Sequence, residues 1–372
     1  MLSVGFVGFR GMVGSVLINR MIEENDFNKI KAFFFSTSQA GGKCPIKQSK
    51  NQILLDAYNV DQLLAMDCIV STQGSNYTNA ILPKLKIIGY AGYIIDASSA
   101  LRMNDDTILV LDPVNKEQII NGLNNGVKYF AGANCSISLP LIGLNGLLKK
   151  NLIEWMSIMT YQAASGAGAN QVRELLKQMQ VISDTNTSMI KDDNNSILEL
   201  IHNVNKTIQA TSFPTQEFAA PLAGSIIPWI DADLGNGMSK EEYKGQVEAN
   251  KLLGLASNTI KIDGLCIRVG VIRSHSAAIT MKLNQNLTID EIEKIIKSDN
   301  LWVNYIPNNK TATLHQLNPV VTSESLKIAV GRLKKSSVGE NIYNVLTVGD
   351  QLLWGAAEPV RRMLNILVEY KA

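Results

Sequence analysis

Cysteine and histidine are scarce in this chain of 372 residues, and their scarcity excludes several kinds of site. The four cysteines lie far apart, and no two of them form a Cys-x-x-Cys pair. That spacing argues against a zinc site and, in a reducing compartment, against disulfide bonds. Because there are three histidines, a general base of the histidine type must be His202, His275 or His315.

Long apolar runs and blocks of like charge are also missing. No uninterrupted apolar segment approaches the roughly 18 residues that a membrane span needs. Residues 1–5 show no basic region followed by a cleavable apolar core, which predicts no signal peptide. A net charge of +2 without a strongly basic block does not indicate nucleic-acid binding. We therefore expect a cytoplasmic protein that has no membrane or nucleic-acid partner.

What remains is an ordinary globular composition, with 46% hydrophobic and 18% charged residues, and a length typical of two domains. Short apolar strands alternate with helical patterns over residues 1–133. Strands are expected at 2–7, 30–35, 68–70, 93–95 and 108–111, and helices at 12–22, 60–65 and 78–86. This alternation predicts an α/β fold that begins with a Rossmann-like, doubly wound nucleotide-binding domain.

The pattern changes after residue 133. Helical patterns at 136–148, 169–179 and 196–206 mix with strands at 156–161 and 264–272. This mixture predicts a second, α+β domain over 134–352 with a mixed or antiparallel sheet. The end of the chain is amphipathic, and we expect a C-terminal helix over 353–372 that packs back on the first domain.

A glycine-rich turn, Gly8-Phe9-Arg10-Gly11-Met12-Val13-Gly14, joins the first strand to the first helix. Small residues there let the backbone approach a pyrophosphate, although this spacing also suits a purely structural turn. An NAD site usually has an acidic residue at the end of the second strand, where this chain has Thr37 and Ser38. Hydroxyls with Arg10 nearby suit a 2′-phosphate, which predicts NADP. The segment 162–168 leads from a strand into a helix and is a further candidate contact for an anion or a nicotinamide.

Cys135 is the candidate nucleophile. It follows the apolar run 127–131 and stands at the start of the helical pattern 136–148. The positive end of a helix dipole favours a thiolate, and the N–H groups there can stabilise an oxyanion. The alternative is an inert structural cysteine, because free cysteine is among the most buried residue types.

His275 is the best partner for Cys135, because the pKa of an imidazole lies near neutrality. His202 falls in a helical pattern and is expected on an exposed face. Arg268 precedes His275 by seven positions, so a straight strand would place the two side chains on opposite faces. Both can serve one site only if the strand bends, bulges or ends before His275.

Charged residues elsewhere are candidates for the same site. Ser239 and Glu242 fit a capping box, which leaves Glu241 and Lys244 as neighbours on one face of a predicted helix. The alternative for that pair is a solvated surface ion pair. Arg102 follows a strand end, which is where ligands gather in a doubly wound sheet.

Taken together, these motifs resemble the aspartate-semialdehyde dehydrogenase family, in its Gram-negative bacterial branch. The resemblance covers essentially the whole chain. Its motifs are the glycine-rich turn, Gly132-Ala133-Asn134-Cys135, Tyr161-Gln162-Ala163-Ala164-Ser165-Gly166, and the segments 225–230, 241–244 and 349–359. It implies reduction of L-aspartyl-4-phosphate by NADPH to aspartate 4-semialdehyde with release of phosphate, in lysine, methionine and threonine biosynthesis. It also implies a homodimer that associates through the second domain.

The resemblance implies a role for each candidate residue. Cys135 would form the acyl-enzyme thioester, His275 would be the acid/base, and Gln162 would orient the acyl group. Arg268, Glu241 and Asn134 would bind the substrate, and Arg102 and Lys244 would hold its phosphate. The NADP contacts would be Gly8, Arg10, Gly11, Met12, Val13, Thr37, Ser38, Gln73, Ser165, Gly166 and Gln351. No residue is expected to bind a metal.

The sequence leaves two alternatives open. One is a related acyl-phosphate reductase, such as N-acetyl-glutamyl-phosphate reductase, or a glyceraldehyde-phosphate dehydrogenase-like protein. An acylated amine would not need Glu241, and a sugar phosphate would not need a carboxylate clamp at Arg268. The other is a nucleotide-binding regulatory module without catalysis, against which the intact Cys135, Gln162 and His275 argue.

Overall fold

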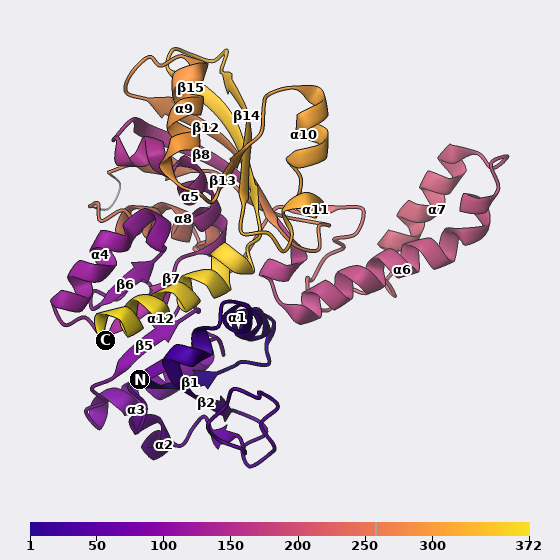
Figure 1. The fold of residues 1–372 in the computed structure, drawn as a ribbon. Coiled ribbons are helices and arrows are strands. Elements are labelled where there is room, and N and C mark those ends of the chain that lie inside the picture. Colours follow the sequence, from indigo (N-terminus) through magenta and orange to yellow (C-terminus); the bar gives the residue numbers. More distant parts are fainter. Residues whose placement is uncertain (257–258) are drawn as a thin grey trace.

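The computed structural model of the protein describes residues 1–256 and 259–372, which build two sheets with their own helices (Figure 1). The first sheet lies at one end of the molecule and the second sheet at the other, and the C-terminal helix lies against the first sheet. The predicted α/β fold, with a parallel first sheet and a mixed second one, is confirmed.

In the described part of the chain the first sheet has seven strands in the order β3-β2-β1-β4-β5-β7-β6. All are parallel. They are β1 (Leu2–Val7), β2 (Ile30–Ser36), β3 (Leu55–Asp56), β4 (Cys68–Ser71), β5 (Tyr93–Asp96), β6 (Thr107–Val110) and β7 (Tyr129–Gly132). The strand order reverses between β1 and β4, which creates the crevice where doubly wound sheets bind ligands.

Helices cover both faces of this sheet, as the continuous apolar runs of its strands require. They are α1 (Met12–Glu23), η1 (Asp26–Lys29), α2 (Val60–Leu64), α3 (Ser75–Ile87) and α4 (Asp112–Asn124). Leu17 and Met21 of α1 pack on one face with Phe6 and Phe34. Ile81 and Leu85 of α3 belong to the cluster on the other face.

The second sheet is mixed and, within the described ranges, has eight strands. Its order is β13-β14-β15-β12-β8-β11-β9, with β10 paired to β8. The strands are β8 (Ile153–Gln162), β9 (Ile226–Ile227), β10 (Lys261–Asp263), β11 (Cys266–Val269), β12 (His275–Leu283), β13 (Val303–Tyr305), β14 (Ile328–Lys335) and β15 (Ile342–Gly349). Its helices are α8 (Lys240–Leu252), α9 (Ile289–Asp299), α10 (Lys310–Gln316) and α11 (Pro319–Thr322), with η2 (Ala164–Gly166) after β8.

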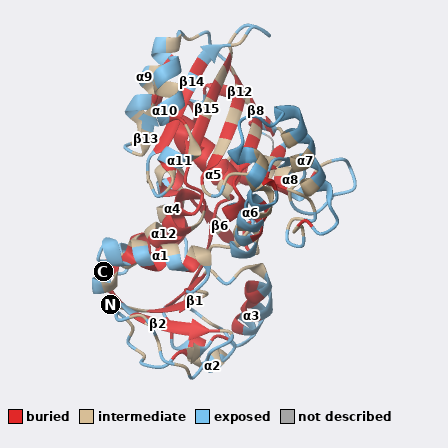
Figure 2. Ribbon diagram, turned by 90° about the vertical axis from the view of Figure 1, so that its right-hand side faces the viewer, coloured by how far each residue is buried: buried red, intermediate tan, exposed pale blue. Residues whose placement is uncertain are grey.

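Helix α5 (Cys135–Lys149) connects the two sheets and carries Cys135 at its start. Residues 136–148 are all buried (Figure 2). A helix that is apolar on every side must be enclosed by protein, and here the second sheet and α9 enclose it. The nucleophile candidate is therefore the first residue of an enclosed helix.

Two helices form an arm that stands away from the body of the molecule (Figure 1). They are α6 (Ala169–Lys191), which is longer than the predicted 169–179, and α7 (Ile197–Gln209). No residue of α7 is buried, and His202 lies on this exposed helix as expected.

The C-terminal segment returns to the first sheet. A π-helical turn, η3 (Leu353–Ala357), leads into α12 (Glu358–Tyr370). Val360, Met363 and Leu367 of α12 pack in the same cluster as Leu17 of α1. Among the helices that the structure describes, none is both long and apolar enough to cross a membrane.

Candidate active site

A cleft of about 450 Å³ lies where the first sheet meets the second domain. Its lining comes from five parts of the chain: the start of α1, the loop after β5, the start of α5, the second domain, and the turn η3. Predicted site residues in this lining are Val13, Arg102, Asn134, Cys135, Gln162, Ser165, Gly166, Glu241, Lys244, Arg268 and Gln351. The structure therefore brings together residues that lie up to 338 positions apart in the sequence (351 − 13).

Cys135 is the first residue of α5, and Asn134 caps this helix by accepting a hydrogen bond from the Ser136 N–H at 2.7 Å. The Cys135 Sγ atom lies 3.6 Å from Nε2 of His275. Burial, and then the nearby Glu241 carboxylate, raise the pKa of the Cys135 thiol to about 11. The cations Arg102, Arg268 and Lys244 act in the opposite direction. The helix dipole stabilises the thiolate by roughly 0.3–1 kcal/mol, but burying the charge costs more than this.

His275 reaches Cys135 because the predicted strand 264–272 ends early. Strand β11 stops at Val269, and β12 begins at His275. Between them Ser274 adopts the left-handed conformation, with φ 76°. Arg268 and His275 thus belong to different strands, which is one of the ways in which both can serve one site.

The backbone around η2 holds His275 in one orientation. The Ala163 N–H donates to Nδ1 of the ring at 3.0 Å. A neutral ring that accepts at Nδ1 carries its proton on Nε2, the atom that faces Cys135. Burial, and then the Arg268 cation, hold the pKa of His275 well below its usual value, so the ring is neutral near pH 7.

Arg268 is held in the same way. Its Nη1 donates to the Ala163 carbonyl at 2.8 Å. Within the described part of the chain its other N–H groups make no hydrogen bond, which leaves donors for a ligand carboxylate. Gly166 allows the two side chains to meet, since a Cβ there would lie 2.8 Å from Nε2 of His275 and 2.9 Å from Nη1 of Arg268.

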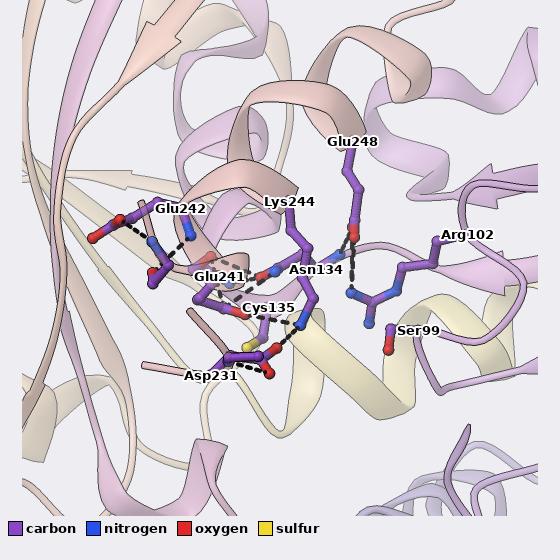
Figure 3. A network of polar contacts seen from close by, with 12 residues as sticks. Ser99, Arg102, Asn134, Cys135, Asp231, Glu241, Glu242, Lys244 and Glu248 are labelled. Atoms are coloured by element: carbon purple, nitrogen blue, oxygen red, sulfur yellow. Dashed lines mark hydrogen bonds and ion pairs between the residues drawn. The ribbon is translucent and has the colours of Figure 1, made fainter. Parts of the chain in front are cut away.

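Helix α8 directs a row of charged side chains toward Asn134 and Cys135 (Figure 3). The predicted capping box of Ser239 and Glu242 is present at its start. Glu241 is buried rather than solvated, and its carboxylate accepts from Nδ2 of Asn134 at 3.1 Å and from Nζ of Lys244 at 3.3 Å.

The Glu241 carboxylate also meets the amide of Gln162. Nε2 of Gln162 donates to it at 3.4 Å. Lys244 in turn pairs with Asp231, a residue of the cleft lining. A ligand anion that binds Lys244 must therefore compete with Asp231 for its ammonium group.

Arg102 approaches the cleft from the first domain. Its Nη1 lies 3.3 Å from Oε2 of Glu248, a buried residue of α8. The Nε atom of Arg102 is buried and has no hydrogen-bond partner among the described residues. An unpartnered donor on a buried guanidinium is costly unless a ligand satisfies it, which points to an anion at this edge.

A second hollow, of about 410 Å³, lies beside the glycine-rich turn. Gly8, Arg10, Gly11, Thr37, Ser38 and Gln73 all line it, whereas Met12, the first residue of α1, lines neither hollow. Gly8 has φ 85°, and a Cβ there would lie 2.6 Å from the Gln73 N atom. The turn can thus pass against the end of β4 only with glycine at this position.

Comparisons with known proteins agree with this arrangement. The family model for the semialdehyde dehydrogenase NAD-binding domain matches residues 3–122, and the model for the semialdehyde dehydrogenase dimerisation domain matches residues 144–354. The structure of aspartate semialdehyde dehydrogenase from Francisella tularensis is 48% identical, with a TM-score of 0.94, over 99% of this chain and 100% of that one. The chain belongs to the semialdehyde dehydrogenase family.

More distant relatives share the fold. Aspartate semialdehyde dehydrogenase II from Vibrio cholerae, complexed with ASA, is 21% identical over 99% of this chain and 98% of that one, with a TM-score of 0.81. The Candida albicans enzyme with NADP is 16% identical over the same shares, with a TM-score of 0.66. At these identities the comparison extends to the fold alone.

In this member of the semialdehyde dehydrogenase family, several residues of the two hollows escaped the sequence analysis. Ser36 accepts from Nη2 of Arg10 at 2.8 Å, and Gln39 accepts from Nη1 of the same guanidinium. Gly355 lies against Cys135, and a Cβ there would be 2.4 Å from the Cys135 Cβ. Glu248, which lines neither hollow, had a local signal, because it follows Lys244 by four positions on the same helix face.

Proposed function

We propose that the chain is an NADP-dependent aspartate-semialdehyde dehydrogenase. It would convert L-aspartyl-4-phosphate to L-aspartate 4-semialdehyde and phosphate through a thioester on Cys135. The observation that carries the proposal is the approach of the Cys135 Sγ to within 3.6 Å of His275 Nε2, in a cleft lined by cations and a carboxylate. The relative from Francisella, which is 48% identical over the whole chain, supports the same reaction.

The charges of the cleft complement the three charged groups of this substrate. Arg268 offers a planar pair of donors to the α-carboxylate, and the buried Glu241 offers an acceptor to the ammonium group. Arg102 and Lys244 supply two cations for the phosphate, next to the sulfur atom that would displace it. Asn134, whose amide already donates to Glu241, completes the substrate contacts.

The chemistry assigned to the chain needs a nucleophile, a proton donor and an orienting group. The Cys135 sulfur attacks the acyl carbon, the C–O bond to phosphate breaks as the C–S bond forms, and the thiol proton leaves with the departing phosphate. The Nε2–H of His275 faces the sulfur and can donate to the oxygen that gains negative charge, then take that proton back in the following step. Gln162 lies within reach of the acyl group and holds it through its amide.

The residues around the glycine-rich turn fit a phosphorylated dinucleotide. Gly11 caps α1 without a side-chain hydrogen bond, so the first N–H groups of the helix remain for a pyrophosphate. Ser36 and Gln39 hold the Arg10 guanidinium at the end of β2, where a ribose 2′-phosphate would lie. Thr37 and Ser38 add hydroxyl donors there. When bound, NADPH would supply the hydride of the reaction.

The second domain offers a surface for a homodimer. Helices α5 and α9 cover one face of its sheet, and alternate residues of β8 and β12 point to the other. These residues are half-buried and include Trp155, Ser157, Met159, Ala278 and Thr280. On the projecting arm, Ile197, Leu198 and Ile201 are exposed. The matching family model is described as a dimerisation domain. Sedimentation should give twice the chain mass of 40.7 kDa.

A comparison of substrates tests the proposed reaction. Steady-state reduction of NADP should require both aspartate 4-semialdehyde and phosphate, and Cys135→Ala should abolish it. N-acetyl-glutamate semialdehyde is the matched competitor, because its acylated amine cannot pair with Glu241. A higher kcat/KM with the acetylated substrate would contradict the proposal and favour the sister reductase. Turnover that survives Cys135→Ala would contradict the thioester.

A further inference from the structure

The phosphate assignment leaves one buried carboxylate next to the cations unexplained. Glu248 is 1% exposed and lies between Arg102 and the turn that carries Cys135 (Figure 3). Its Oε1 and Oε2 lie 3.4 and 3.3 Å from Nη1 of Arg102. Oε2 also accepts the Asn134 N–H at 3.0 Å. One carboxylate thus connects the first domain, the start of α5 and helix α8.

The contact with Glu248 uses only one end of the Arg102 guanidinium. Because Nη1 faces the carboxylate, the opposite edge, made of Nε and Nη2, is left for a ligand. Nε is buried without a partner among the described residues, and Arg102 lines the cleft. A guanidinium edge with two parallel N–H groups matches two oxygens of a phosphate.

Lys251, three positions after Glu248 on the same face of α8, holds the backbone of the same loop. Its Nζ donates to the carbonyls of Arg102 and Asn104, at 2.7 Å in both cases. Helix α8 therefore holds Arg102 at two points, its side chain through Glu248 and its backbone through Lys251. Neither residue lines the cleft.

We propose that Glu248, assisted by Lys251, is a positioning residue for the phosphate site. It turns the Nε–Nη2 edge of Arg102 toward the ligand and fixes that edge relative to Asn134 and Cys135. The inference rests on the proposed function, because it assumes that Arg102 binds the phosphate. A carboxylate that served only to brace the two domains would affect stability without changing how the enzyme uses phosphate.

The variant Glu248→Gln separates these two roles. It keeps the size of the side chain and one oxygen for the Asn134 N–H, but it removes the charge that holds Arg102. Steady-state NADP reduction at varied phosphate should show a KM for phosphate raised about tenfold or more, the effect of losing one charge-assisted contact. A single burst of NADPH forms without phosphate and reports acylation of Cys135. Because phosphate takes no part in this step, the burst rate should stay within about twofold, a change under 0.5 kcal/mol.

Three further variants complete the test. Asp112→Asn is the control. It breaks the pair between Arg362 and another buried carboxylate, which lies away from the cleft, and it should lower the melting temperature without changing the KM for phosphate. Lys251→Met should raise that KM by a smaller factor, about threefold, because it frees the backbone of the loop but leaves the Arg102 side chain paired with Glu248. It tests the same positioning if Glu248→Gln does not fold. Arg102→Leu should raise the KM, and adding Glu248→Gln to it should change little more.

The outcomes separate this inference from the proposed function. If Arg102→Leu leaves the KM for phosphate unchanged, the phosphate assignment fails, and the role of Glu248 fails with it. If Arg102→Leu raises the KM but Glu248→Gln and Lys251→Met leave it unchanged or lower it, only the positioning role is overturned. An equal loss in the burst and in the phosphate-dependent rate would show that Glu248 is merely a brace.

Discussion

A single methyl group at Gly355 should disable the nucleophile while leaving the fold in place. Gly355 lies in the π-helical turn η3, and a Cβ there would be 2.4 Å from the Cys135 Cβ and 2.8 Å from its Cα. Carbon atoms pack at about 3.5–4.0 Å, so Gly355→Ala requires a displacement of about 1 Å. Trp354 is fully buried and donates to the Leu326 carbonyl at 2.8 Å, which holds η3 in place. The displacement therefore falls on Cys135.

A shift of about 1 Å at a reacting atom can lower the rate about 100-fold. The same overpacking should lower the free energy of unfolding by about 1–3 kcal/mol. The assay is kcat/KM for NADP reduction together with a thermal melt, and activity should fall about 100-fold in a protein that is still folded. A folded Gly355→Ala enzyme with kcat/KM within about threefold of wild type, under 0.7 kcal/mol, would show that the substitution does not displace Cys135.

Gly245→Ala is the matched control for this substitution. Gly245 lies inside α8, and nothing lies within 4 Å of the position where its Cβ would be. Alanine in a helix interior should stabilise the protein by roughly 0.5–1 kcal/mol relative to glycine. Activity should remain at the wild-type level, which would attribute the loss at Gly355 to its contact with Cys135.

Three further predictions concern charge. Glu241→Gln should lower the pKa of the Cys135 thiol, because a carboxylate that disfavours the thiolate is removed; the pH at which iodoacetamide alkylation reaches half its maximum rate should fall, and a rise would count against this effect. His275→Gln should flatten the pH dependence of stability. The pKa of buried His275 is lowered in the folded state, so below about pH 6.5 the unfolded chain takes up a proton that the folded chain does not. As the pH falls below about 6.5, the wild type should therefore lose up to about 1.4 kcal/mol of unfolding free energy per pH unit relative to His275→Gln. Urea unfolding measures this difference, and His202→Gln is the control. Arg10→Ala should lower the ratio of kcat/KM with NADP to kcat/KM with NAD by about tenfold or more, the effect of losing one charge-assisted contact. An unchanged ratio would show that Arg10 does not bind the 2′-phosphate.

The parts of the fold that periodicity predicted are those with strong local signals. The ends of β1, β2, β4, β5 and β6 differ from the predicted strands by at most one residue at either end. These strands are buried on both faces, so their sequences are continuous apolar runs bounded by polar turns. The two- and three-residue strands β9, β10 and β13 are too short to show any period, and their pairing depends on neighbours distant in the sequence.

The contacts of the site also divide into those with a local sequence signal and those without one. Residues within a motif, such as Asn134 with Cys135 or Ser239 with Glu242, follow from local capping rules. The contact of Glu248 with the Asn134 N–H spans 114 positions, and the contact of Gly355 with Cys135 depends on how η3 passes over α5. Packing between elements decides such contacts, and no local pattern encodes them. The relation of Arg268 to His275 was ambiguous for the same reason, because it depends on where β11 ends.

In the proposed reaction, Cys135 carries the acyl group of an aspartyl substrate. The most direct measurement is mass spectrometry of the intact enzyme after mixing with aspartate 4-semialdehyde and NADP in the absence of phosphate, followed by mapping of the modified peptide. One aspartyl group per chain should appear on Cys135, disappear when phosphate is added, and be absent in Cys135→Ser. An unmodified enzyme that nevertheless forms a stoichiometric amount of NADPH, or an adduct on any other residue, would contradict the account.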